Sequence, residues 1–268
     1  MTTIPAGDRL SISSIGHTSS AGRWRTESMR AHASPRLIVF TKGQGRITVA
    51  GRVRGFGPNN VVYLPAGTLY GVELGTTGFA QIITIPEAMA YDWPDDVHHL
   101  RLRDVSVQKE LAILLDQLER ELLSDEAGCQ RAAHHRLALL AIFLERQLGG
   151  EERSDPNAAE RLVEAYAGLV AEAFHQHKGV ADYAAALGVT PTHLSRCCKA
   201  VSGRPAHALL ADRRMFEARK LLRNSKAPVA HIARDLGFSS PAYFTRAFRA
   251  AEGASPTEFR AKGPVALN

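Results

Sequence analysis

The sequence predicts an α+β protein of two domains, an antiparallel β-barrel with a helical hairpin followed by an all-α domain. Its 268 residues exceed the ~100–200 typical of one domain. Short β-rich runs fill residues 23–86, whereas apolar residues recur at helical spacing from residue 111 onward. We expect four parts: a barrel over 1–95, a helical hairpin over 96–148, a flexible linker over 149–157 and a helical domain over 158–268.

The composition is that of an ordinary folded protein, with 45% hydrophobic and 22% charged residues. Its longest uninterrupted apolar run, residues 137–144, is far shorter than the ~20 residues of a membrane-spanning helix. The first residues lack the basic and apolar segments of a secretory signal. Cysteines number three, an odd count, and two of them are adjacent. We therefore expect a cytoplasmic protein with reduced cysteines and no membrane partner.

The barrel is predicted from short apolar runs that end at turn residues. Residues 37–40 are β-rich and precede the turn cluster Lys42-Gly43-Gln44-Gly45. Residues 61–64 end at Pro65-Ala66-Gly67, and residues 79–85 supply a further apolar run. Many short strands at this spacing are typical of an antiparallel barrel or sandwich.

The hairpin is predicted from two leucine patterns at helical spacing, separated by a break at residues 125–128. The patterns consist of Leu111, Leu114, Leu115, Leu118 and Leu122, then Leu137, Leu140, Ala141, Leu144 and Leu148. Two such helices form an antiparallel pair, whose leucine faces pack either onto the barrel or onto a second subunit. Residues 149–157 are polar and rich in helix breakers, which indicates a linker.

The basic excess lies entirely in the last part of the chain. Residues 1–157 carry 17 Lys/Arg against 18 Asp/Glu, whereas residues 158–268 carry 16 against 9. A domain that binds a polyanion such as nucleic acid has this charge balance. A basic surface that serves only solubility is the alternative that charge alone leaves open.

The helical domain contains an internal repeat, because residues 180–196 resemble residues 229–246. In each copy a glycine, Gly188 or Gly237, follows a short helical pattern and permits a tight turn. Hydroxyl residues after the glycine can cap the next helix. That second helix would bury an apolar residue and present a polar face bearing arginine, which suits the DNA major groove. One copy is also consistent with an ordinary helical core, but two in a basic region favour DNA binding.

The second copy, which reads IARDLGFSSPAYFTRAFR over residues 232–249 and GASPTEFR over 253–260, resembles the AraC/XylS family of transcriptional regulators. Residues 213–222, RRMFEARKLL, resemble the long helix that joins the family's two DNA-reading units. The resemblance covers about residues 158–262. It implies a sequence-specific, effector-responsive activator without enzymatic activity or cofactor. Its expected partners are double-stranded DNA, a second copy of the chain, RNA polymerase and a small-molecule effector.

By this resemblance the two recognition helices contact boxes about one helical turn apart, ~10–10.5 bp. The candidate contacts are Thr190, Thr192, Ser195, Arg196 and Lys199 in the first unit, and Ser239, Ser240, Ala242, Thr245, Arg246 and Arg249 in the second. Contact with phosphates instead of bases is the alternative for the arginines. Cys198 departs from the family, which places a core aromatic residue there, as Phe248 does in the second unit. A redox role for Cys197 and Cys198 is a further alternative.

The first ~95 residues resemble, more weakly, the cupin-like sensing barrel of such regulators. The resemblance depends on His32, Gly43-Gln44-Gly45-Arg46, Gly57-Pro58-Asn59-Asn60 and Pro65-Ala66-Gly67-Thr68. Tyr70 stands where a histidine is usual, and one histidine does not build a transition-metal site. We therefore expect no metal. The adjacent pairs His98-His99 and His134-His135 are placed on helices, where neighbouring side chains point about 100° apart and do not chelate.

A small-molecule pocket in this barrel would be lined by aromatic and oriented polar groups. The candidates are Trp24, His32, Arg36, Tyr63 and Tyr70. The alternative is that the aromatic residues are only core and Arg36 is solvated. Two other functions stay open at this point: a regulator without effector whose barrel only dimerises, and a cupin enzyme with a helical appendage.

Overall fold

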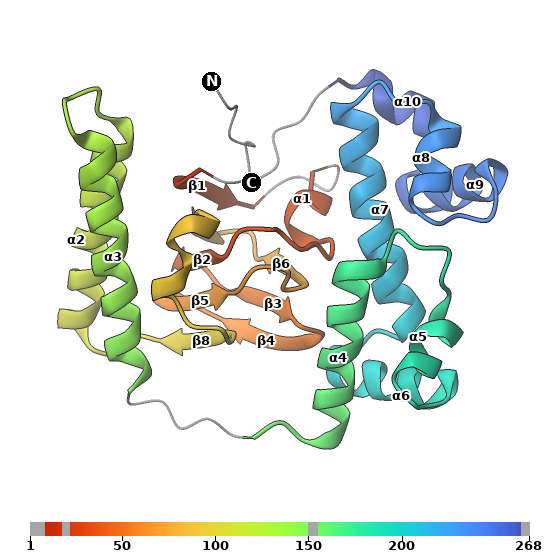
Figure 1. The fold of residues 1–268 in the computed structure, drawn as a ribbon, viewed down its shortest axis with the longest axis horizontal. Helices are drawn as coiled ribbons and strands as arrows, with labels where there is room; N and C mark the ends of the chain where they lie inside the picture. Colours follow the sequence, from red (N-terminus) through yellow and green to blue (C-terminus); the bar gives the residue numbers. More distant parts are fainter. Residues whose placement is uncertain (1–8, 18–21, 150–154, 264–268) are drawn as a thin grey trace.

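The computed structural model describes residues 9–17, 22–149 and 155–263. A β-domain lies at the centre, with a helical hairpin on one side and the helical domain on the other (Figure 1). Residues 150–154 of the predicted linker lie outside the described residues. Within the described ranges, no helix is both long and apolar enough to cross a membrane.

The β-domain consists of two antiparallel sheets, a five-stranded one in the order β1-β7-β2-β5-β8 and a three-stranded one in the order β4-β3-β6. The antiparallel fold class is as predicted, but the barrel is an open sandwich of two separate sheets. The strands are β1 Ser11–Gly16, β2 Arg36–Lys42, β3 Gly45–Val49, β4 Arg52–Phe56, β5 Asn60–Leu64, β6 Tyr70–Leu74, β7 Phe79–Thr84 and β8 His98–Arg101.

The central strand β2 contains four consecutive apolar residues, Leu37 to Phe40, and the structure shows why. Side chains alternate across a sheet, so Leu37 and Val39 face one way while Ile38 and Phe40 face the other. Leu37 and Val39 pack with the helical hairpin, whereas Ile38 and Phe40 pack with the three-stranded sheet. Both faces of this strand are therefore buried.

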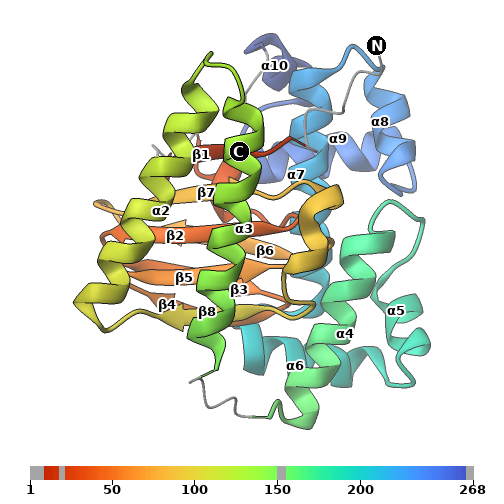
Figure 2. The ribbon, with the colours of Figure 1, turned by 60° about the vertical axis from the view of Figure 1, so that its left-hand side comes forward.

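The hairpin is formed by α2 Val105–Leu123 and α3 Cys129–Leu148, which lie across the five-stranded sheet (Figure 2). Leu111, Leu118, Leu137 and Leu140 are buried in the cluster that joins both helices to that sheet. The sequence left open whether the leucine faces pack onto the β-domain or onto a second subunit. In the structure they pack onto the five-stranded sheet of the β-domain.

The expected helical placement of His98-His99 is wrong. Both residues lie in β8, which pairs with β5 and extends the sheet past residue 95 into the part assigned to the hairpin. His98 is buried, and His99 Nε2 lies 2.9 Å from Asn60 Oδ1. Residues 98–101 adopt an extended conformation because they pair with β5, which is about 40 residues earlier in the chain. The local sequence around His98 does not indicate this pairing.

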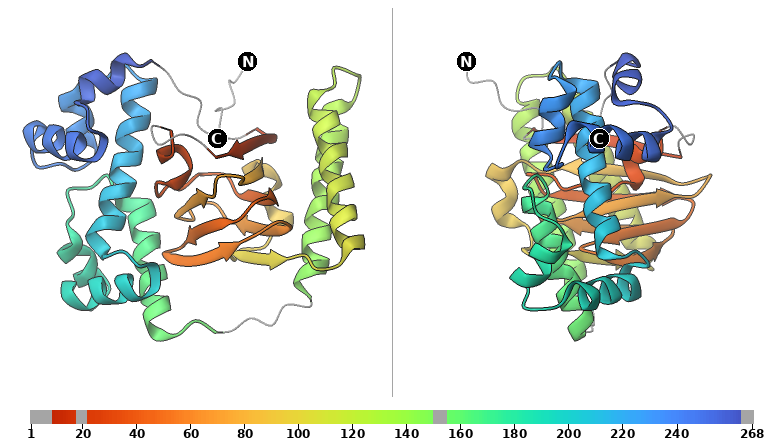
Figure 3. Two further views of the ribbon diagram at one scale, coloured as in Figure 1. Left: turned by 180° about the vertical axis from the view of Figure 1, so that it is seen from behind. Right: turned by 90° about the vertical axis from the view of Figure 1, so that its right-hand side faces the viewer.

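The helical domain consists of two helix-turn-helix units joined by a long helix, as predicted (Figure 3). The helices are α4 Ala158–Ala173, α5 Val180–Ala186, α6 Pro191–Ser202, α7 Ala206–Asn224, α8 Val229–Asp235, α9 Pro241–Glu252 and α10 Pro256–Ala261. Helix α7 contributes buried residues to the core of each unit, Leu209 to the first and Phe216 to the second. It therefore fixes the two units relative to each other.

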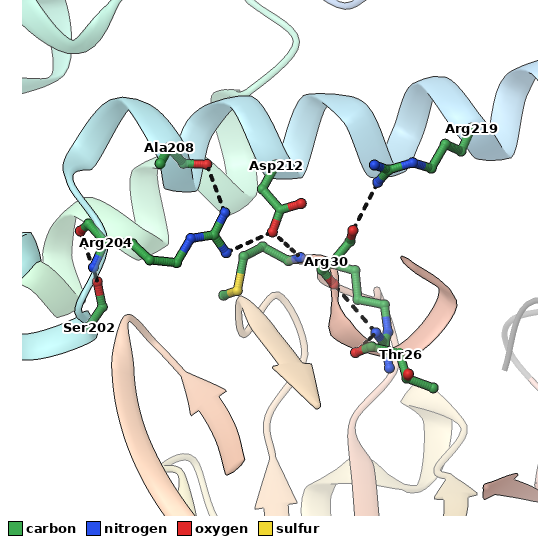
Figure 4. Close-up of polar contacts among 9 residues, drawn as sticks. Thr26, Arg30, Ser202, Arg204, Ala208, Asp212 and Arg219 are labelled. Atoms are coloured by element: carbon green, nitrogen blue, oxygen red, sulfur yellow. Dashed lines mark hydrogen bonds and ion pairs between the residues drawn. The ribbon is translucent and has the colours of Figure 1, made fainter. Parts of the chain in front are cut away.

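The β-domain contacts α7 directly, through the segment that follows the short helix α1 Trp24–Glu27 (Figure 4). The backbone N–H of Met29 donates to Asp212 Oδ2 at 3.1 Å, and Arg219 Nη1 donates to Ser28 Oγ at 2.9 Å. Met29 is buried in the core of the first unit. The α7 helix is thus held from the β-domain side as well as by the two helix-turn-helix units.

Candidate nucleic-acid interface

The two helix-turn-helix units have the same backbone at their turns. Gly188 has φ +68° between α5 and α6, and Gly237 has φ +74° between α8 and α9. Glycine adopts this left-handed conformation without the steric cost that other residues incur. The sequence prediction of a glycine-dependent turn in each copy is therefore met in the structure.

The second helix of each unit begins with the same hydroxyl cap and the same proline. Thr190 Oγ1 accepts from the His193 backbone N–H at 3.2 Å, and Ser240 Oγ accepts from the Tyr243 N–H at 3.1 Å. Proline occupies the first turn of both helices, where its missing N–H costs nothing. Thr190 and Ser240 thus set where α6 and α9 begin.

The buried and exposed faces of α6 and α9 coincide at positions 50 residues apart. Leu194 and Phe244 are fully buried, so the opposite face of each helix is left to solvent. Of the predicted contacts, the exposed ones are Thr190, Thr192, Arg196, Lys199, Ser239, Ala242, Arg246 and Arg249, and the half-buried ones are Ser195, Ser240 and Thr245. The Thr245 hydroxyl donates to the Pro241 carbonyl at 2.9 Å, within its own helix.

Two further side chains on this face were not among the predicted contacts. Tyr243 is 50% exposed and rests near the Phe238 ring, with centroids 6.0 Å apart. Its counterpart His193 is exposed, with Nδ1 3.1 Å from Arg196 Nη2. The predicted contacts on α6 and α9 lie 50 residues apart in pairs, and His193 and Tyr243 have the same spacing. That spacing could have identified both residues from the sequence. Hydroxyl and imidazole groups there can contact phosphates.

Cys198 packs in the core of the first unit at the position of Phe248 in the second. Both side chains are fully buried. Burial raises the pKa of the Cys198 thiol to about 12, and neighbouring Cys197 adds to this. A thiol held protonated is a poor nucleophile, so the geometry favours packing over redox chemistry.

Some of the basic excess of this domain serves internal contacts of α7. Arg214 donates to the carbonyls of Phe174, Gln176 and Lys178 at 2.7, 2.7 and 2.8 Å, which are groups of the segment after α4. Arg219 Nη2 lies 2.6 Å from Glu252 Oε1, at the end of α9. These two arginines tie both units to α7, a role that total charge does not reveal.

The predicted pocket residues divide between three places. His32, Arg36 and Tyr70 lie together at one end of the sandwich, with Arg36 Nη2 3.0 Å from His32 Nδ1 and the His32 and Tyr70 ring centroids 5.8 Å apart. Trp24 instead contacts the helical domain, at 6.0 Å from the Phe216 ring centroid. Tyr63 points to the hairpin side and stacks on Trp93.

Arg30 joins the first group, although its position in a loop gave no sign of burial. Its guanidinium lies 4.5 Å from the centroid of the Tyr70 ring. As for metals, the described part of the chain holds no group of three or more His, Cys, Asp or Glu side chains suited to an ion.

A family model described as a helix-turn-helix domain matches residues 183–262. The arabinose operon regulatory protein of Salmonella typhimurium is 34% identical over 85 residues, which are 32% of this chain and 30% of that protein. Its Escherichia coli counterpart is 25% identical over 243 residues, covering 84% of this chain and 80% of its own.

The virulence regulon transcriptional activator VirF of Yersinia enterocolitica is 25% identical over 265 residues, or 88% of this chain and 93% of VirF. Among solved structures, ToxT from Vibrio cholerae is 11% identical with a TM-score of 0.45, covering 94% of this chain and 96% of ToxT. The match with the Salmonella relative spans about a third of that protein's length. The tandem units and this match show that residues 183–262 form a helix-turn-helix domain, and over most of its length the chain is similar to transcription regulators of the AraC type.

Proposed function

We propose that this protein is a sequence-specific regulator whose helices α6 and α9 enter two major-groove segments about one helical turn apart, ~10–10.5 bp. The observation that carries the proposal is the coincidence of the two exposed faces, with Arg196 and Lys199 on α6 matched by Arg246 and Arg249 on α9. Both helices are capped alike, and α7 connects them rigidly.

The test begins with selection of binding sites for the full chain from random duplex DNA. Arg196→Ala and Arg246→Ala should then each lower affinity by about 1–3 kcal/mol and relax base preference at one box only. Arg46→Ala is the matched control, because Arg46 is an exposed arginine of the β-domain paired with Glu73. A uniform loss on selected and random DNA would assign that arginine to phosphates. Absence of any selected sequence would contradict the proposal.

The β-domain supplies the regulatory part of the proposal. It touches α7 through Ser28 and Met29, so a ligand that favours one placement of the β-domain would bias the placement of both reading units. We infer that the effector is a small molecule and that the regulator activates transcription through RNA polymerase. We also infer that it acts in the cytoplasm. The relatives named as regulators and activators support a regulator over an enzyme.

The outer face of the hairpin supports a homodimer. Ile113 is 56% exposed on α2, and Leu139 and Ile142 are 45% and 42% exposed one turn apart on α3. Apolar side chains that remain exposed on a pair of helices can be buried when the same surface of a second copy packs against them. The hairpin lies on the side of the β-domain away from the reading units, so pairing there leaves α6 and α9 free (Figure 1).

A further inference from the structure

The end of the sandwich beside α7 contains more buried positive charge than the described residues neutralise. Arg30 is 1% exposed and Arg36 is 8% exposed. Arg30 Nη1 donates to the Thr26 carbonyl at 2.6 Å, and Arg36 Nη2 contacts His32. Apart from the Tyr70 hydroxyl, which lies close to both guanidiniums, Nε and Nη2 of Arg30, and Nε and Nη1 of Arg36, have no hydrogen-bond partner among the described residues.

The nearest part of α7 adds cations, and both of its carboxylates already have partners. Asp212 accepts from the Met29 N–H and lies 2.9 Å from Arg204. Glu217 lies 3.0 Å from Arg213 and 2.9 Å from Lys220. Arg213 is buried, and its Nε also lacks a partner within the described chain. Arg213 and Lys220 are close enough to His32 to lower its pKa together with Arg30 and Arg36, after burial. His32 therefore stays neutral and adds no further positive charge to this group.

An arginine cannot relieve this situation by losing its proton, because its pKa is far above neutral pH. Removing a charged group from water without a partner is among the most costly events in folding. Burial raises the pKa of the buried Tyr70 hydroxyl, but the charges of Arg30 and Arg36 and hydrogen bonds from both guanidiniums lower that pKa overall. The surroundings thus favour negative charge at this point.

We propose that an oxyanion, the carboxylate or phosphate group of a small molecule, binds at this end of the sandwich between Arg30, Arg36 and Tyr70. The planar fork of a guanidinium matches the paired oxygens of such a group. The inference rests on the proposed function, since this molecule would be the effector. Arg213 belongs to α7, so the anion attracts a group of the helical domain and favours the docked arrangement. A neutral ligand such as a sugar leaves the two guanidiniums uncompensated.

The test uses thermal unfolding of the full chain without DNA. Benzoate, succinate and inorganic phosphate are compared with benzamide, succinamide and sodium chloride at matched ionic strength. We expect at least one anion to raise Tm saturably, by about 5–10 °C at 100 times its Kd. Benzoate or succinate acting alone identifies a carboxylate, and phosphate acting alone identifies a phosphate group.

Variants provide the second arm. Arg36→Met, and Arg36→Gln in case the first does not fold, should abolish the anion-dependent shift and raise Tm in anion-free buffer, because each removes an uncompensated charge. Arg46→Gln, an exposed arginine, should change neither result. The inference is overturned if no anion exceeds sodium chloride or its neutral amide, or if both Arg36 variants lower Tm in anion-free buffer. Selection of DNA sites by the wild type is independent of these outcomes and tests the proposed function separately.

Discussion

The two turn glycines offer a matched pair of substitutions, because their backbones agree and their surroundings differ. At Gly188, with φ +68°, an added Cβ would meet no atom within 4 Å. At Gly237, with φ +74°, the added Cβ would lie 2.3 Å from the Gln176 carbonyl oxygen. That oxygen accepts from Arg214 Nη2 at 2.7 Å, so moving it disturbs the anchor between α7 and the segment after α4.

The magnitudes follow from these contacts. The left-handed conformation costs a non-glycine residue about 1–2 kcal/mol, and this is the whole expected effect of Gly188→Ala. Gly237→Ala adds the cost of overpacking, typically 1–3 kcal/mol, for a total of about 2–5 kcal/mol. At roughly 2–4 °C per kcal/mol, the two variants should differ visibly in Tm.

Circular dichroism at 222 nm during heating gives the Tm of each variant, and hydrogen exchange of α8 and α9 amides locates the loss. Gly237→Ala should also weaken binding to two-box DNA more than Gly188→Ala, because Gly237 touches the segment that Arg214 ties to α7. Equal losses of stability in the two variants would refute the assigned close contact with Gln176.

Further predictions address the caps, the dimer and the buried histidine. Thr190→Ala and Ser240→Ala should each cost about 1 kcal/mol of unfolding free energy, measured by urea titration; no change would show that the caps are not formed. Leu139→Glu combined with Ile142→Glu should yield monomers in sedimentation, and an unchanged mass would place the dimer elsewhere. Burial, with Arg36 and Arg30, lowers the pKa of His32 to about 2 from 6.5. The unfolded chain therefore binds a proton that the folded chain excludes. Unfolding free energy should fall below pH 6.5 by about 1.4 kcal/mol per pH unit. His32→Gln should reduce that slope, and an unchanged slope would contradict the assignment.

The helix-turn-helix units could be predicted from sequence because their determinants are local. The glycine at φ +74°, the Ser240 cap and the buried Phe244 all lie within eight residues of one another, and each acts on its own turn or helix. The first unit has the same three determinants, 49 residues earlier for the glycine and 50 for the cap and the buried residue, so the sequence indicates this structure twice. Leucine spacing predicted the hairpin for a similar reason.

Features that depend on distant partners escaped prediction. Arg30 is buried because Tyr70, the first residue of β6, covers it, whereas its own neighbours in sequence suggest only an exposed loop. Arg214 reads as surface charge until the carbonyls of Phe174 and Gln176 are seen beside it. Likewise, the choice between a closed barrel and two sheets depends on pairings between strands far apart in the chain, which alternation of apolar residues does not specify.

Hydroxyl-radical footprinting of the full chain on a selected DNA site tests the central claim most directly. Two reading units fixed on α7 predict two protected segments on one face of the duplex, with centres ~10–10.5 bp apart. Arg196→Ala should weaken protection of one segment and Arg246→Ala that of the other. A single protected segment in the wild type, or two segments on opposite faces of the duplex, would contradict simultaneous binding by α6 and α9.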